Sequence, residues 1–147
     1  MIEMKVDDCV KAIGGETLMG AGEKYFHGVS IDSRTLKKDE LFFCIRGDRF
    51  DGHDFIQEAR NKNAAAIIFS DGRNMLSKKM DAPFFVRVED TLKSLQELAR
   101  FYRKKMPVKV VGVTGTNGKS TTKEMIASIA ETKFKTIKTK GNLNNHI

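Results

Sequence analysis

The sequence of 147 residues contains no tryptophan, only two prolines and only two cysteines. Cys9 and Cys44 lie far apart among apolar neighbours, and no C-x-x-C spacing occurs, which argues against a disulfide-rich secreted domain. We expect buried, reduced thiols, with a single disulfide between the two as the alternative. No apolar run approaches the ~18 residues that a membrane-spanning helix needs, and the N-terminus does not resemble a signal peptide. These absences predict a cytoplasmic protein without a membrane span.

Acidic residues are outnumbered by basic ones, and the formal net charge is +7. A basic chain invites a nucleic-acid interpretation, but its lysines and arginines are scattered and no aromatic residues interleave with them to stack on bases. Arg103, Lys104 and Lys105 end a predicted helix, where cations complement the helix dipole. We therefore expect a solvated surface that favours small anions, and no nucleic-acid partner.

The most informative stretch runs from Val108 to Thr122. Four valines within six residues are typical of a strand buried on both faces, and residues 123–130 have a helical pattern. Between the two, Gly115 and Gly118 allow a tight turn whose N–H groups can point at phosphate oxygens, next to the positive end of the helix dipole. This pattern predicts a nucleotide-phosphate loop made by Thr114, Gly115, Thr116, Asn117, Gly118, Lys119, Ser120 and Thr121.

Within this loop, Lys119 would reach the outer phosphates as the catalytic cation, and the Ser120 hydroxyl would hold a magnesium ion. One position departs from the general pattern G-x-x-x-x-G-K-[ST], because Val113 stands where the first glycine is required. The alternative is a helix that merely follows a flexible loop, with Lys119 in solvent.

Strands and helices alternate along the rest of the chain, which predicts an α/β fold. We expect a first helix over residues 6–13, stopped by two glycines, and an extended segment at 25–31 followed by a turn at 32–35. Asp54 and Asp90 are the expected N-caps of two further helices. Strands are predicted at 41–45, 64–69 and 83–88, with residues 72–82 as a loop or a short helix.

The Met106-Pro107 step is the predicted domain boundary, because proline ends the preceding helix and the valine strand begins there. Residues 1–106 have enough apolar elements for a small core. Residues 107–147 supply only a strand, the loop, a helix and a second short strand near 135–139. About forty residues are near the lower limit for an unaided fold, so we expect an incomplete nucleotide-binding domain.

Three stretches together resemble the Mur ligases, which build the peptide of bacterial cell-wall precursors. The first is the phosphate loop at 114–122, since valine at position 113 is normal in that family. The second comprises Asp32-Ser33-Arg34, residues 39–43, Gly47 and residues 51–55, and is similar to the first domain that holds the UDP end of the substrate. The third, residues 141–147 with 123–125, is similar to the member that adds D-alanyl-D-alanine.

The resemblance implies an ATP- and Mg²⁺-dependent amide ligation. The carboxylate of UDP-N-acetylmuramoyl-tripeptide attacks the γ-phosphate to give an acyl phosphate, and the amine of D-alanyl-D-alanine then displaces phosphate. We expect the 147-residue chain to be inactive alone, with residues 1–106 as the UDP-substrate domain and 107–147 as the start of the ATP domain.

Candidate residues for substrate binding lie in three places. Ser33 and Arg34 can offer a hydroxyl and a guanidinium to the diphosphate, or they can form an ordinary turn with Arg34 in solvent. His53 either touches the uridine or anchors its loop. Asn142, Asn144 and Asn145 are candidates for lining the junction with the rest of such an enzyme.

Other functions compatible with the sequence are the neighbouring ligase that adds the third peptide residue, a non-catalytic UDP-sugar-binding module, and a basic nucleic-acid-binding module. The stretch 141–147 distinguishes the two ligases. Binding that depends steeply on salt and ignores uridine nucleotides would favour the nucleic-acid module.

Overall fold

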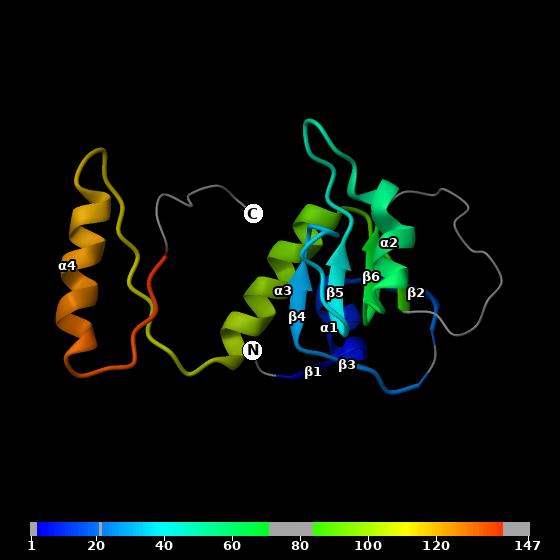
Figure 1. The fold of residues 1–147 in the computed structure, drawn as a ribbon. Coiled ribbons are helices and arrows are strands. Elements are labelled where there is room, and N and C mark those ends of the chain that lie inside the picture. The colour runs from blue at the N-terminus through cyan, green and yellow to red at the C-terminus, as the bar shows by residue number, and fades with distance from the viewer. Residues whose placement is uncertain (1–2, 21, 71–83, 140–147) are drawn as a thin grey trace. The chain divides into compact units, whose positions relative to one another are not determined.

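A computed structural model describes residues 3–20, 22–70 and 84–139 of the chain, and its secondary structure is drawn in Figure 1. The chain divides into two compact units, Met1–Met106 and Pro107–Ile147. Each unit is described by itself below.

The first unit is built on a five-stranded sheet with the strand order β2-β7-β6-β5-β4. Four neighbouring strands are parallel, and β2 pairs antiparallel with β7 at one edge. The strands are β2 (Glu16–Met19), β4 (Gly28–Ser30), β5 (Glu40–Phe43), β6 (Ala66–Phe69) and β7 (Phe84–Arg87). A separate two-stranded ribbon joins β1 (Met4–Lys5) to β3 (Tyr25–Phe26).

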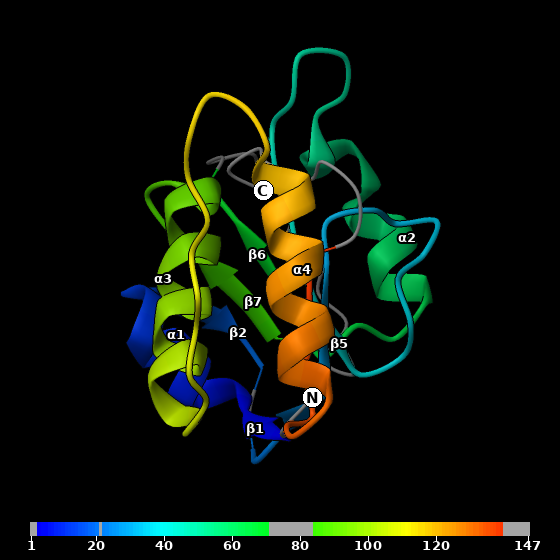
Figure 2. The same cartoon turned by 90° about the vertical axis from the view of Figure 1, so that its left-hand side faces the viewer.

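Helices cover both faces of this sheet, with α1 (Val6–Ile13) and α3 (Thr91–Lys105) on one side and α2 (Ile56–Asn61) on the other (Figure 2). Strand β5 shows how the core is divided, because Leu41 and Phe43 face α1 and α3 whereas Phe42 faces α2. All three side chains are fully buried, as expected for a parallel strand covered on both faces. The α/β fold class predicted from the sequence is confirmed.

Local signals place the helix ends of the first unit. Helix α1 ends at Gly14, which adopts the left-handed conformation at φ 64° that glycine accepts without a Cβ penalty. The Asp90 side chain accepts a hydrogen bond from the Lys93 N–H and caps α3 as predicted. The expected segments at 25–31, 41–45, 64–69 and 83–88 each contain strands in the structure.

Two predictions for the first unit are wrong in detail. The residue that caps the helical segment after β5 is Asp51 rather than Asp54, because the chain turns into a 3₁₀ helix, η1 (Gly52–Phe55), before α2 begins. Strand β2 was not predicted, because its residues Glu16–Met19 are exposed or half-buried and have no alternating pattern. The loop or helix expected at 72–82 lies outside the described residues.

In the described part of the second unit, the one regular element is α4 (Lys119–Glu131), which begins four residues before the predicted start. The strands predicted at 108–113 and 135–139 are not formed there. A strand forms only when a neighbouring strand pairs with it, and the described part of this unit contains no strand. The side chains of Val108, Val110 and Val111 are accordingly more than half exposed.

Candidate functional site

The predicted phosphate loop is a tight turn at the N-terminus of α4. Gly115 and Gly118 have φ values of 146° and 75°, a region that side chains rarely adopt. Gly118 is the N-cap, and its carbonyl accepts the first helical hydrogen bond, from the Thr122 N–H at 2.9 Å. The two glycines therefore turn the chain where the sequence pattern placed the turn.

Lys119 folds back over this loop. Its Nζ donates to the carbonyl oxygen of Gly115 at 2.6 Å and to that of Thr116 at 3.3 Å. The ammonium thus lies over the loop backbone at the positive end of a 13-residue helix. Residues 114–121 are all exposed, so a phosphate can reach the loop from solvent. This arrangement fits an anion, and Ser120 is the second residue of α4.

A second candidate region is the turn that follows β4. The Asp32 carboxylate accepts from the Arg34 N–H at 2.9 Å, which is an Asx turn, and it also binds the Arg34 guanidinium through Nε at 3.0 Å and Nη2 at 2.7 Å. The hydrogen bonds from Arg34 lower the pKa of Asp32 to about 2. The Asx turn is formed, and the Arg34 guanidinium is paired with Asp32 while its side chain is 85% exposed.

Ser33 in the same turn faces the protein interior. It is 4% exposed, and its hydroxyl donates to the Glu58 carboxylate of α2 at 2.8 Å. That hydrogen bond, and the ion pair with Lys62, lower the pKa of Glu58. Lys62 also donates to the carbonyl oxygens of Ser33 and Arg34, at 2.6 and 3.1 Å. The serine therefore joins the turn to α2.

The third candidate region is the loop from Arg46 to His53 after β5. It folds back on itself through an antiparallel bridge between Arg46 and Asp51 and a 2.9 Å hydrogen bond from the Gly47 N–H to the Phe50 carbonyl. Phe50 is 72% exposed in this loop. The Arg46 guanidinium pairs with the Asp51 carboxylate at 3.0 Å. The loop is thus a closed hairpin that carries an arginine and an exposed aromatic ring.

His53 anchors this hairpin to the sheet. Its ring is buried, with Nδ1 at 2.5 Å from Asp51 Oδ1 and Nε2 accepting the Ser70 N–H at 3.1 Å. Because Nε2 is an acceptor, the ring proton is on Nδ1 and points to Asp51. Burial would raise the pKa of Asp51, but hydrogen bonds from the His53 backbone and ring and from Arg46 outweigh it and lower the pKa.

The turn at 32–35 and the hairpin at 46–51 follow adjacent parallel strands, so both lie at the carboxyl edge of the sheet (Figure 1). Open α/β sheets bind ligands at this edge. A hollow of about 340 Å³ lies there too, lined by Ile45, Arg46, Ser70, Glu89, Asp90, Thr91 and Leu92. Ser33, Arg34 and His53 thus belong to one edge of the first unit, whereas the phosphate loop belongs to the second unit.

Other predicted candidates contribute less. Asn142, Asn144 and Asn145 lie outside the described residues.

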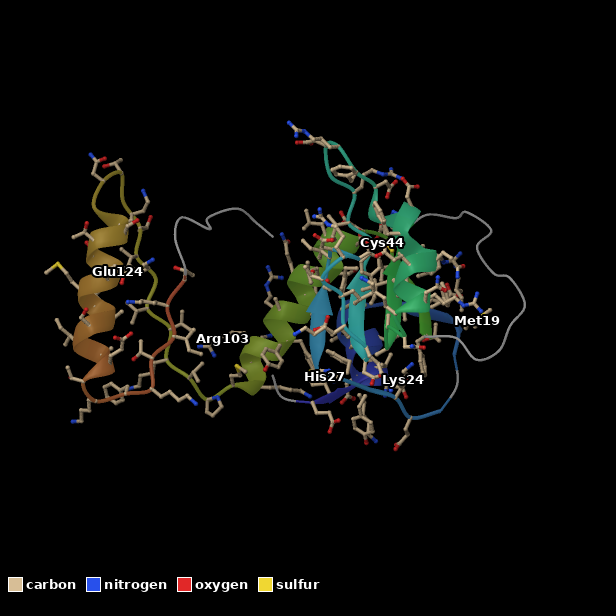
Figure 3. The ribbon with its side chains drawn as sticks, in the orientation of Figure 1. Met19, Lys24, His27, Cys44, Arg103 and Glu124 are labelled. Atoms are coloured by element: carbon tan, nitrogen blue, oxygen red, sulfur yellow. The ribbon has the colours of Figure 1, made fainter. Side chains whose placement is uncertain are left out.

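Both cysteines are free thiols, buried in the first unit, where Cys44 is labelled in Figure 3. Burial raises the pKa of Cys9 to about 12 and also raises the pKa of Cys44, so neither thiol is a ready nucleophile. Within the described residues, no group of His, Cys, Asp and Glu side chains is arranged to hold a metal ion, and no helix is long and apolar enough to cross a membrane.

Sequence reasoning missed Asp51, Glu58 and Lys62. Asp51 carried a usable signal, because an aspartate two residues before a histidine and directly before glycine suits a cap. Glu58 and Lys62 had none, since an acidic and a basic residue four apart are ordinary on an exposed helix face.

Residues of both units match known protein families. Residues 25–103 match the family described as "Mur ligase family, catalytic domain", and residues 113–147 match the "Mur ligase middle domain". The chain belongs to the Mur ligase family. Two family domains therefore meet close to the division between the two compact units.

Curated relatives of two kinds are similar to this chain. The UDP-N-acetylmuramoyl-tripeptide–D-alanyl-D-alanine ligase of Bacillus subtilis is 40% identical over 82% of the chain and 26% of its own length. The UDP-N-acetylmuramoyl-L-alanyl-D-glutamate–2,6-diaminopimelate ligase of Clostridium tetani is 38% identical over 87% of the chain and 27% of its own length. The chain thus spans about a quarter of the length of these relatives.

Solved Mur ligase structures share the fold. A D-alanyl-D-alanyl ligase from Acinetobacter baumannii, with 26% identity, covers 99% of the chain at a TM-score of 0.84, over 32% of its own length. MurF ligase from Thermotoga maritima in complex with ADP is 36% identical over 80% of the chain and 26% of its own length, at a TM-score of 0.69. The second of these relatives binds an adenine nucleotide.

Proposed function

We propose that this Mur ligase chain provides the two nucleotide-binding regions of an ATP-dependent ligase that joins D-alanyl-D-alanine to UDP-N-acetylmuramoyl-tripeptide. The second unit takes the phosphates of ATP, and the first unit takes the UDP end of the acceptor substrate. The observation that carries the proposal is the loop at 115–118, closed by two left-handed glycines and covered by the Lys119 ammonium.

The loop residues bind and orient ATP in this proposal. When ATP binds, the Lys119 ammonium donates to a γ-phosphate oxygen in place of the Gly115 and Thr116 carbonyls. The N–H groups at the start of α4 contact the phosphate oxygens. Ser120 would hold Mg²⁺, which when bound neutralises charge on the phosphate oxygens. Positioning and charge neutralisation are what phosphoryl transfer to a carboxylate requires of a protein.

The UDP end is assigned to the carboxyl edge of the first sheet. Arg34 supplies an exposed guanidinium at the carboxyl edge of the sheet, and the same edge holds a hollow of a size suited to part of a nucleotide. His53 is buried, and both of its ring nitrogens form hydrogen bonds within the protein. It therefore anchors the hairpin rather than touching the uridine.

The second candidate is the neighbouring ligase that adds 2,6-diaminopimelate, since a relative of that name is nearly as similar. We favour the D-alanyl-D-alanine ligase because of the stretch at 141–147. With this sequence in a ligase of the relatives' length, we expect ATP-dependent consumption of D-alanyl-D-alanine. Consumption of diaminopimelate in its place would select the second candidate.

Binding of UDP to the 147-residue chain, measured by calorimetry or ligand-observed NMR, tests the assignment of the first unit. We expect weak, saturable binding that Arg34→Ala reduces. Silence at millimolar UDP would overturn the assignment. Steeply salt-dependent binding to nucleic acid, with indifference to uridine nucleotides, would replace it with a nucleic-acid-binding function.

A further inference from the structure

Helix α2 holds the Asp32–Thr35 turn through two side chains. Glu58 accepts the Ser33 hydroxyl at 2.8 Å, and Lys62 donates to the carbonyl oxygens of Ser33 and Arg34. The two side chains also pair with each other, with 3.3 Å between Lys62 Nζ and Glu58 Oε1. We call Ser33, Glu58 and Lys62 the α2 clasp. It contacts the carbonyl groups on either side of Arg34.

The clasp determines which groups of the turn remain for a ligand. The one proton of the Ser33 hydroxyl goes to Glu58, so this hydroxyl is not a donor to a phosphate oxygen. The Arg34 guanidinium gives its Nε–H and one Nη2–H to Asp32, and three of its five N–H donors are not used by that pair. Arginine, not serine, is therefore the group of this turn that can bind a diphosphate.

We infer that Glu58 and Lys62 are positioning residues for the diphosphate of a uridine nucleotide, acting by holding the turn that aims Arg34. This inference rests on the proposed function of the first unit. Glu58 lies on α2 and Lys62 is the C-cap of that helix, and they reach the turn across 25 to 29 positions of sequence. The side chains of Glu58 and Lys62 are about one-third to two-fifths exposed, so these two members of the clasp can be substituted at the surface, whereas Ser33 is buried.

Electrostatics and positioning make opposite predictions for Glu58. Removing a negative charge near a diphosphate site should tighten UDP binding if charge alone matters. If the clasp matters, Glu58→Gln should weaken UDP binding, because loss of the ion pair with Lys62 loosens the turn that carries Arg34. The sign of the change therefore separates the two explanations.

The test is the affinity of the 147-residue chain for UDP and, separately, for uridine, measured by NMR titration. We expect Glu58→Ala to weaken UDP binding about fivefold and to leave uridine binding unchanged. Glu58→Gln should weaken UDP binding less, because its amide oxygen can still accept the Ser33 hydroxyl while the ion pair with Lys62 is lost. Ser33→Ala should have the same effect as Glu58→Ala, and the double variant should be no worse than either single variant.

Gln57→Ala is the matched control on the same helix, because Gln57 bonds only to Asn61 of α2 in the described contacts. It should bind both ligands like the unaltered chain. Circular dichroism and urea unfolding confirm that each variant is folded, and Glu58→Asp, which keeps the charge, should recover part of the affinity.

Unchanged or tighter UDP binding by Glu58→Gln would overturn the inference and leave the proposed function in place. Equal weakening of UDP and uridine binding would also overturn it, since that result indicates general loosening of the unit. Absence of UDP binding by the unaltered chain would overturn the proposed function, and the inference with it.

Discussion

At the scale of single residues, His53 shows how a polar group is kept in a buried position. Both ring nitrogens are used, one by a carboxylate and one by a backbone N–H. His53→Ala removes the ring and leaves the Ser70 N–H without this acceptor, so we expect the free energy of unfolding to fall by about 2–3 kcal/mol. Urea denaturation measures the loss.

The matched control is His27→Ala. His27 is exposed, and its hydrogen bond to the Asp39 carbonyl comes from its backbone N–H, which alanine retains. We expect a change within about 0.5 kcal/mol. Similar losses for the two variants would show that the buried hydrogen bonds of His53 do not stabilise the fold.

Asp32 makes stability depend on pH. Its pKa of about 2 in the folded protein lies below the value near 3.9 of an unfolded aspartate. The contribution is therefore complete above about pH 4 and is lost as the pH falls toward 2. We expect the urea midpoint of Asp32→Asn, which can still form the Asx turn, to fall less between pH 4 and pH 2 than that of the unaltered chain. The control Asp48→Asn, in the exposed hairpin, should show a larger fall than Asp32→Asn. An identical decline in both variants would contradict this account.

At the scale of elements, Gly52 sets how closely η1 approaches strand β5. A Cβ at this position would lie 2.7 Å from the Ile45 nitrogen and 2.8 Å from the Cys44 Cα, and both are backbone atoms that cannot rotate away. We expect Gly52→Ala to lower the free energy of unfolding by about 2 kcal/mol or more and to displace the 46–51 hairpin. Thermal or urea unfolding measures this.

Gly47 lies in the same hairpin and provides the control. A Cβ there would meet one atom, the Phe50 carbonyl oxygen, at an ordinary 3.6 Å. Gly47→Ala should therefore change the unfolding free energy little. If both glycine variants were equally stable, the close approach at Gly52 would have no energetic consequence.

Local patterns made the helices and central strands of the first unit predictable. Helix α1 has its apolar spacing and its glycine stop within a few residues of sequence, and α3 has its Asp90 cap. Strand β2 could not be predicted, because it exists through pairing with β7, where Glu16 lies opposite Arg87. The valine strand was predicted because β-branched residues favour strands. It is not formed because a strand also needs a partner strand, which the local sequence does not reveal.

The candidate site also has a part that local sequence predicts and a part that it does not. The phosphate loop is local, so its glycines, its lysine and the helix behind it could be read from consecutive residues. The α2 clasp is not local, because Ser33 meets Glu58 and Lys62 only after β5 and the hairpin bring α2 to the turn. An anchoring role for His53 was one of two interpretations, but its partner Ser70 lies 17 residues away and had no signal.

At the scale of the whole molecule, the two compact units are proposed to bind different nucleotides. The first unit has a complete sheet with helices on both faces and polar loops at its carboxyl edge. The second has a loop and helix suited to phosphates, and its α4 also carries Glu124, labelled in Figure 3, whose carboxylate pairs with Lys138 and Lys123. The central claim is that UDP and the adenine nucleotide bind in different units.

Chemical-shift mapping on the ¹⁵N-labelled chain, with UDP and with ADP plus Mg²⁺ added separately, tests this claim most directly. We expect UDP to shift the amide signals of residues 32–36 and 46–51. We expect ADP with Mg²⁺ to shift those of residues 115–121, and to do so less in Lys119→Met. The account would be contradicted if UDP left the first unit unshifted, or if ADP with Mg²⁺ left the loop before α4 unshifted.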